Sequence, residues 1–146
     1  MHYLVRTALA VAGASLLVGS RFQALTDGVE VVILNGPNAG TYKSTSSEVA
    51  CAHFKEQKFS TASWSDTDIK DPKKMSAAGI KVDNPELAGP KKGQVEISFG
   101  GHAMAYLASV PVTMTVKGKG AVFVFEGTIK GTRMKVTGTC KVVEEL

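Results

Sequence analysis

The sequence predicts an all-β fold, an antiparallel β-sandwich or small barrel, preceded by an apolar N-terminal helix. Two observations in the body of the chain indicate this class. Short runs rich in β-branched and aromatic residues recur along the chain, and Gly-rich turns separate them. In the clearest run, residues 133–143, apolar and polar side chains alternate strictly, as they do in a strand with one buried and one wet face.

The size and composition of the chain allow one globular domain. It has 146 residues, of which 44% are hydrophobic and 21% charged, enough for one core and too few for two. The net charge is +4 and the basic residues are scattered among acids, so nothing here predicts a nucleic-acid partner. We expect a signal peptide or membrane-anchor helix at 1–22, a linker at 23–28 and the β domain at 29–146.

The N-terminal segment has the features of an export signal. Arg6 is the one charge of the short initial region, and residues 7–19 carry no charge. A helix of that length spans about 20 Å, less than the roughly 30 Å hydrocarbon core, which is typical of a signal peptide. With its apolar neighbours the segment is just long enough to span, with Arg6 and Arg21 at opposite interfaces.

Cleavage and retention of this segment both stay open. Ser20 stands where a lipoprotein signal has its lipid-accepting cysteine, so lipidation at that position is chemically excluded. Val18 and Ser20 make a mediocre cleavage site. Alanines four apart would let a neighbouring helix approach closely, although alanine is also common in signal sequences. The residues that we assign to a membrane anchor are Ala8, Ala12, Leu16 and Leu17.

The first half of the domain predicts a hairpin and a further strand. Residues 29–44 have β-branched flanks around NGPNAG at 35–40, a stretch dense in turn formers, so they predict a hairpin. Residues 47–54 predict a strand in which the period of two places Cys51 and His53 on one face.

Residues 55–93 are the least regular part of the sequence. They hold three of the five prolines, so we predict long loops with one short helix around residues 72–78. Asp66, Asp68 and Asp71 resemble a fragment of a calcium loop, but the Gly and the distal Glu of an EF-hand are missing. We interpret these acids as part of a solvated loop.

The C-terminal third predicts a meander of strands. The turns KGKG and TIKGT separate its last three strands. The strands are expected at residues 94–99, 110–116, 121–127 and 133–143. The buried face of the last one is expected to carry Met134, Val136, Gly138, Cys140 and Val142. The strand at 121–127 is apolar on both faces, which predicts a central position or contact with a partner.

Cys51 and Cys140 are the two cysteines of the chain, and both lie on apolar strand faces. An even number of cysteines in an exported chain favours a disulfide, and closing so long a loop stabilises by about 4–5 kcal/mol in the chain-entropy model. The alternative is a metal, because Cys51, His53, His102 and Met104 are the ligand types of a blue-copper site. That reading has an unfamiliar spacing and leaves Cys140 unexplained, so we expect neither a metal nor a cofactor.

No constellation of catalytic residues stands out in the sequence. It contains no nucleophile elbow and no His-Glu-x-x-His, and the Gly and Lys spacing at residues 36–43 differs from a phosphate loop. We therefore expect no enzyme. The loop at 98–106 has two glycines and side chains that suit a partner or pocket, or alternatively forms a Gly bend with Met and Tyr in the core. The candidate contact residues are His102, Met104, Tyr106, Phe123 and Phe125.

The succession GPNAGTY, VAC, an aromatic-rich strand and then EGT and KVTGTC carries a family resemblance. It resembles small exported bacterial lipoprotein domains of unknown function, and it is more distantly similar to the mycobacterial lipoprotein-antigen type. In both, an early cysteine and one in the last strand frame a β-rich fold. The resemblance implies a disulfide, a surface location and no assigned enzyme, and Ser20 departs from its lipidated cysteine.

These observations predict a non-enzymatic β domain on the exported side of a bacterial membrane, periplasmic or at the cell surface. In the first hypothesis it is an accessory or stabilising subunit, anchored in the lipid bilayer and held by other subunits of a membrane complex. In the second it is a secreted or cell-surface module that binds a small apolar ligand or lipid in its β body. A deep apolar pocket would favour the second.

Overall fold

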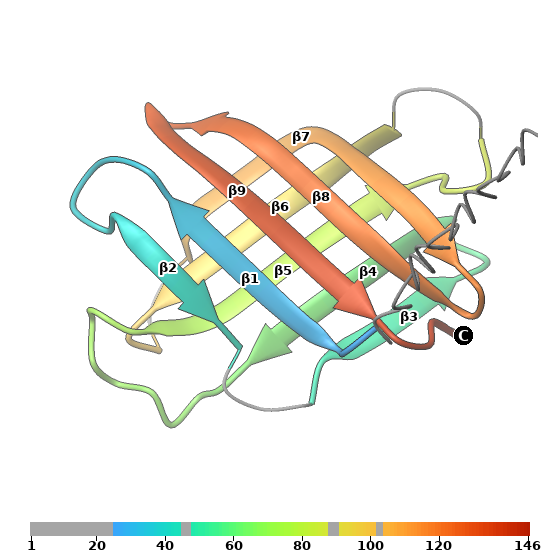
Figure 1. Ribbon diagram of the computed structural model, residues 1–146, viewed down its shortest axis with the longest axis horizontal. Coiled ribbons are helices and arrows are strands. Elements are labelled where there is room, and N and C mark those ends of the chain that lie inside the picture. Colours follow the sequence, from blue (N-terminus) through green and yellow to red (C-terminus); the bar gives the residue numbers. More distant parts are fainter. Residues whose placement is uncertain (1–24, 45–47, 88–90, 102–103) are drawn as a thin grey trace, which may run out of the picture.

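The computed structural model describes residues 25–44, 48–87, 91–101 and 104–146. These residues form an all-β fold of ten strands without a helix, as the sequence predicts (Figure 1). The expected N-terminal anchor lies outside them, and among the described residues we find no helix long and apolar enough to cross a membrane. The strands are β1 (Gly28–Ile33), β2 (Gly40–Lys43), β3 (Ala50–Phe54), β4 (Phe59–Ser65), β5 (Met75–Asp83), β6 (Lys91–Phe99), β7 (Met104–Lys117), β8 (Gly120–Ile129), β9 (Thr132–Cys140) and β10 (Glu144–Glu145).

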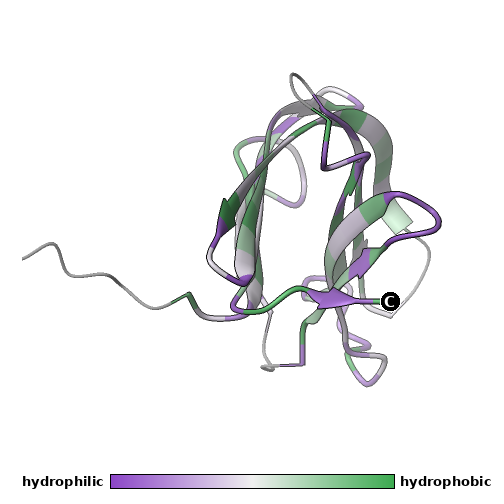
Figure 2. Cartoon of the chain, turned by 90° about the vertical axis from the view of Figure 1, so that its right-hand side faces the viewer, coloured by the Kyte–Doolittle hydropathy of each residue, from purple (hydrophilic) through white to green (hydrophobic). Residues whose placement is uncertain are grey.

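The strands build one curled sheet in the order β10-β3-β4-β5-β6-β7-β8-β9-β1-β2. The long strand β7 makes the corner, because its residues 104–112 pair with β6 and its residues 113–117 pair with β8. One wall of the curl is therefore β3 to β6, and the facing wall is β8, β9, β1 and β2 (Figure 2). Since the edge strands β2 and β10 do not pair with each other, the expected sandwich or barrel is an open half-barrel.

The predicted hairpins are present. β1 and β2 pair from Glu30 opposite Lys43 to Ile33 opposite Gly40, and β7, β8 and β9 form the expected meander. The turn between β8 and β9 has positive φ at both central residues, 48° at Lys130 and 77° at Gly131. That is the two-residue turn whose twist matches antiparallel strands, which explains why the TIKGT sequence joins them so tightly.

The alternation predicted for the last strand is confirmed as far as Cys140. Met134, Val136 and Cys140 are buried, whereas Lys135 on the opposite face is exposed. β9 ends at Cys140, so the period-two argument does not reach beyond it. Val142 is accordingly 46% exposed, and its assignment to the buried face is wrong.

Within residues 55–93 the predicted short helix is wrong, and the predicted long loops are correct only in part, chiefly at residues 66–74. β4 and β5 lie in this region, and β5 pairs along its length with β4 and β6. Met75 starts β5 where the helix was expected. The inward residues of β4 are Ser60, Ala62 and Trp64, of which two are small or polar. The strand is buried on one face without showing hydrophobic alternation.

The two walls are joined and closely packed around a disulfide. Cys51 on β3 and Cys140 on β9 form the expected bridge, with an S–S distance of 2.09 Å and a Cα–Cα distance of 5.8 Å. Beside it, a Cβ atom added at Gly138 would lie 2.7 Å from Ile80 Cγ2 and 2.8 Å from the Cβ of Ala62. Glycine at this position of β9 therefore allows the close approach of the facing wall.

Candidate functional site

The residues that the sequence marks as partner contacts do not gather on one surface. Phe123 and Phe125 are 0% and 3% exposed, and Tyr106 is 6% exposed, so all three side chains belong to the core. Met104 is at the surface, with 51% of its area exposed. His102 lies outside the described residues, as do the four residues assigned to the anchor.

The position of β8 explains why its aromatic rings are not surface contacts. β8 lies between β7 and β9, and its side chains alternate so that Phe123 and Phe125 point into the curl. Val122 and Val124 occupy the outer face and are half-buried. The expectation of a central strand is therefore correct, and its phenyl rings lie in the core.

The loop after β6 is a bend docked onto the start of β5. Gly100 and Gly101 have φ values of 67° and 70°, in the region that favours glycine. The amide of Gly101 donates a hydrogen bond to Ser76 Oγ at 2.9 Å. Farther along, the Asn38 side-chain amide donates to the buried Tyr106 hydroxyl at 3.4 Å. Tyr106 thus follows the alternative expectation, a glycine bend leading into a core tyrosine.

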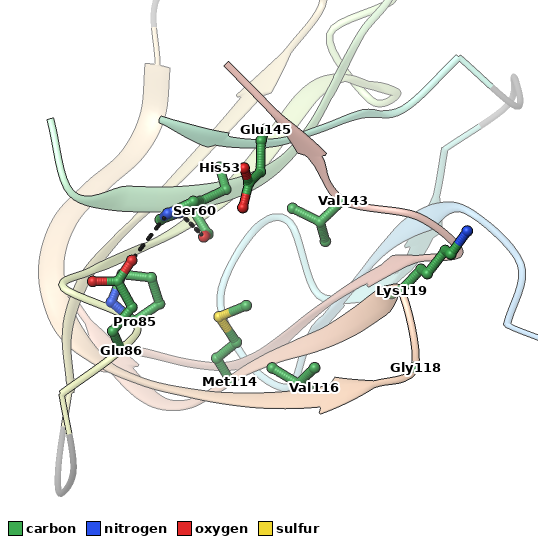
Figure 3. A pocket seen from close by; sticks show the side chains of 11 residues that line it. His53, Ser60, Pro85, Glu86, Met114, Val116, Gly118, Lys119, Val143 and Glu145 are labelled. Atoms are coloured by element: carbon green, nitrogen blue, oxygen red, sulfur yellow. Dashed lines mark hydrogen bonds and ion pairs between the residues drawn. The ribbon is translucent and has the colours of Figure 1, made fainter. Parts of the chain in front are cut away.

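A pocket at one end of the half-barrel is the strongest candidate site, and we call it the end pocket (Figure 3). Its volume is about 320 Å³. The wall strands β3 and β4, the loop after β5, the β7–β8 turn and the C-terminal tail meet around it. Its lining residues are His53, Ser60, Pro85, Glu86, Met114, Val116, Gly118, Lys119, Gly120, Val143 and Glu145.

The C-terminal tail forms one rim of the end pocket by bridging the two walls. The amide of Val143 donates a hydrogen bond to the Lys119 carbonyl oxygen at 2.9 Å, on the side of the β7–β8 turn. The amide of Leu146 donates to the His53 carbonyl oxygen at 2.9 Å, and β10 pairs in parallel with β3. The tail therefore places Val143 and Glu145 at the pocket.

His53 is the polar centre of the end pocket. Its Nδ1 lies 2.9 Å from Ser60 Oγ, and its Nε2 lies 3.2 Å from Glu86 Oε1 (Figure 3). An ionised carboxylate can only accept, so Nε2 carries the hydrogen and donates to Glu86. The Ser60 hydroxyl can either donate to Nδ1 or accept from it. Because Ser60 is 1% exposed on β4, this contact holds the imidazole ring in one orientation.

The surface across from His53 is apolar. Met114 and Val116 on β7, together with Val143 of the tail, face the pocket (Figure 3). Val116 is 67% exposed, so this side is open to solvent. Two other charged residues line the pocket: Lys119 points away from His53, whereas the Glu145 carboxylate lies on the same side of the pocket as His53 (Figure 3). Glu145 Oε2 is 3.5 Å from Lys55 Nζ.

Ser60, His53 and Glu86 are the residue types of a serine hydrolase, but their placement differs from one. A nucleophilic serine must reach a substrate carbonyl beside N–H groups that stabilise the developing oxyanion. Ser60 is almost fully buried in a strand paired on both sides, by β3 and β5, and its hydroxyl contacts Nδ1 while the acid contacts Nε2. The two contacts orient the imidazole, and we build no hydrolytic proposal on them.

The structure does not provide the free thiolate that the blue-copper alternative requires. The sulfur of Cys51 is bonded to that of Cys140, so it is not free to bind a metal ion. His102, a second member of that ligand set, lies outside the described residues. Cys51 and His53 do share the inward face of β3, as their spacing predicts, because they pair with the buried Ala62 and Ser60.

Both polar partners of His53 escape sequence reasoning. Ser60 belongs to β4, where the sequence predicts a loop. A strand prediction at β4, paired with β3, would place Ser60 opposite His53. Glu86 lies in the loop after β5, and only the tertiary structure brings it to Nε2.

Comparison with known proteins finds no family model, no curated protein and no solved structure that matches this chain.

Proposed function

We propose that the protein is a non-catalytic binding module of an exported compartment, and that it takes a small, mainly apolar ligand in the end pocket. One observation carries the proposal: the pocket has an apolar side, formed by Met114, Val116 and Val143, across from a polar side on which Ser60 holds His53 in one orientation. Binding sites for small molecules usually combine an apolar lining with a few placed polar groups.

The size of the end pocket suits a small ligand. Its volume of about 320 Å³ is near the lower end of the range for ligand sites, about 300–1,000 Å³. Deeper in the curl, Phe123, Ile80 and Val95 are fully buried and fill the interior. A ligand therefore enters from the end of the half-barrel and does not run along its axis.

The disulfide and the apolar N-terminal segment support the exported location. Disulfides persist in oxidising compartments and are rare in the cytosol. The bridge between Cys51 and Cys140 joins the two walls, so it belongs to the folded architecture. Residues 7–19 have the length and lack of charge of an export signal.

The proposal is tested by titrating the full chain with octan-1-ol and following backbone amide shifts by NMR. We expect saturable shifts at the lining residues. Val116→Lys should weaken binding at least tenfold, because a charge in an apolar site is costly to desolvate. Leu34→Lys, which changes another exposed apolar residue beyond the far end of β1, is the matched control and should leave binding unchanged. Saturable shifts elsewhere, or none at all, would remove the proposal.

A second candidate function is that of an accessory subunit, held against a membrane complex by a retained N-terminal segment. It is favoured by exposed apolar side chains on β7 outside the pocket, since Met104 and Leu107 are 51% and 42% exposed. Exposed apolar groups close together are typical of protein contacts. Gentle extraction of membranes, followed by sequencing of the N-terminus, tests this candidate. A free protein starting at Arg21 or later would exclude it.

A further inference from the structure

We propose that the natural ligand of the end pocket is an amphiphile with a carboxylate head, and that His53 Nε2 is the donor that recognises this head. Glu86 then acts as an internal occupant, a carboxylate of the chain itself that covers the donor until the ligand displaces it. This inference rests on the proposed function and names the ligand class of the same site.

The two partners of this ion pair differ greatly in exposure. The side chain of His53 is 13% exposed, whereas that of Glu86 is 69% exposed. The imidazole belongs to β3 and is fixed from behind by Ser60, while Glu86 belongs to the loop after β5. The donor is therefore part of the wall strand β3. The Glu86 carboxylate that it binds belongs to an exposed side chain on a loop, so this side chain can turn away from His53.

Displacing Glu86 costs little. Contacts between an exposed carboxylate and a partly exposed cation or donor contribute weakly to stability, because water screens them and side-chain freedom is lost. Once released, the Glu86 carboxylate regains hydration. A ligand carboxylate that takes its place makes the same charge-assisted hydrogen bond, which is stronger than a bond to a neutral acceptor.

The end pocket has a polar side and an apolar side, which match the head and the alkyl tail of an amphiphile. His53 lies on one side, and Met114 and Val116 lie across from it (Figure 3). A carboxylate at Nε2 would direct an alkyl chain along this apolar side and out past the open rim at Val116. Lys119 points away from His53, and Lys55, 3.5 Å from Glu145 Oε2, offsets part of the negative charge of Glu145, so His53 is the donor that a ligand head meets.

The test compares octanoate with octan-1-ol, two probes with the same tail and different heads, on the full-length protein. We expect octanoate to bind about threefold more tightly, in line with the extra strength of a charge-assisted bond after Glu86 is displaced. Octanoate should also shift the ring resonances of His53, whereas octan-1-ol should shift only the apolar lining.

Three variants sharpen the comparison. Glu86→Ala removes the internal competitor and should raise octanoate affinity about threefold while leaving octan-1-ol affinity unchanged. His53→Phe keeps an aromatic ring without the donor and should abolish the preference for octanoate. Lys135→Gln removes a charge from the exposed outer face of β9, outside the lining of the pocket, and should change neither affinity.

The outcomes separate this inference from the proposed function. Equal affinities for the two probes, with no effect of Glu86→Ala, would overturn the carboxylate inference and leave an apolar binding site standing. Absence of binding by both probes would overturn the proposed function as well. Because Glu86 is an exposed loop residue, Glu86→Ala gives a decisive result even where His53→Phe fails to fold.

Discussion

β9 and β4 face each other across the half-barrel, and in both strands every second residue is buried, yet the sequence pattern predicts this burial only for β9. In the first half of β9, the large apolar side chains of Met134 and Val136 alternate with the charged side chains of Arg133 and Lys135. Along β4, the inward positions hold Ser60 and Ala62 before Trp64, and the other positions hold one phenylalanine, one threonine and two serines. Burial in this protein therefore does not require a hydrophobic pattern.

The reason for the difference is the distance between the walls. Near the disulfide the walls approach so closely that β9 itself carries a glycine, Gly138, opposite Ala62 and Ile80. A large side chain on β4 would have no room there. Interior packing is tight enough that the size of one residue constrains the residue it faces.

Removing the disulfide is the largest expected perturbation of this arrangement. Replacing Cys51 and Cys140 together by Ala should lower the free energy of unfolding by about 4 kcal/mol, because the unfolded chain gains the entropy of the opened loop. Urea unfolding of the two proteins measures the change. A loss below about 1 kcal/mol would mean that packing alone holds the walls together.

Truncating a large inward residue tests the β9 side of the comparison. Met134→Ala should cost about 3 kcal/mol, since Met134 is 1% exposed and its loss leaves a cavity. Its neighbour Lys135 points to solvent, so Lys135→Ala is the matched control and should change stability by less than about 0.5 kcal/mol. Similar effects of the two variants in thermal unfolding would contradict the alternation.

Adding one methyl group tests how close the walls are. Gly138→Ala should cost about 2 kcal/mol by overpacking, because the new Cβ would meet Ile80 and Ala62. Gly28→Ala on β1 is the matched control and should be nearly neutral, since its nearest contact would be at 3.6 Å. In the Gly138→Ala background, Ala62→Gly should recover part of the loss, and strict additivity would argue against direct contact.

Several features were predictable from the sequence because they depend on local rules. Turn residues such as Lys130 and Gly131 set tight hairpins, and the strict alternation along β9 identifies its buried face. The even number of cysteines on apolar faces predicted the bridge between Cys51 and Cys140. These signals established an all-β class and most of the strands of its C-terminal half.

The predictions that failed depend on neighbours distant in the sequence. β4 and β5 are strands because both their edges find partners, and no local hydrophobic pattern announces β4. Phe123 and Phe125 suggested a surface contact on a strand apolar on both faces, but the curl of the sheet turns their face inward.

By itself, the sequence determined the class of the fold, the turns of its first hairpin and of its C-terminal meander, and the pairing of its cysteines, since each depends on residue type and spacing. The tertiary structure decided the end pocket. His53 lies on β3, and Ser60 lies on β4, where the sequence predicts a loop. Glu86 lies in the loop after β5. The curl of one sheet brings these three residues opposite the apolar residues of β7. Their positions in the sequence do not by themselves place them there.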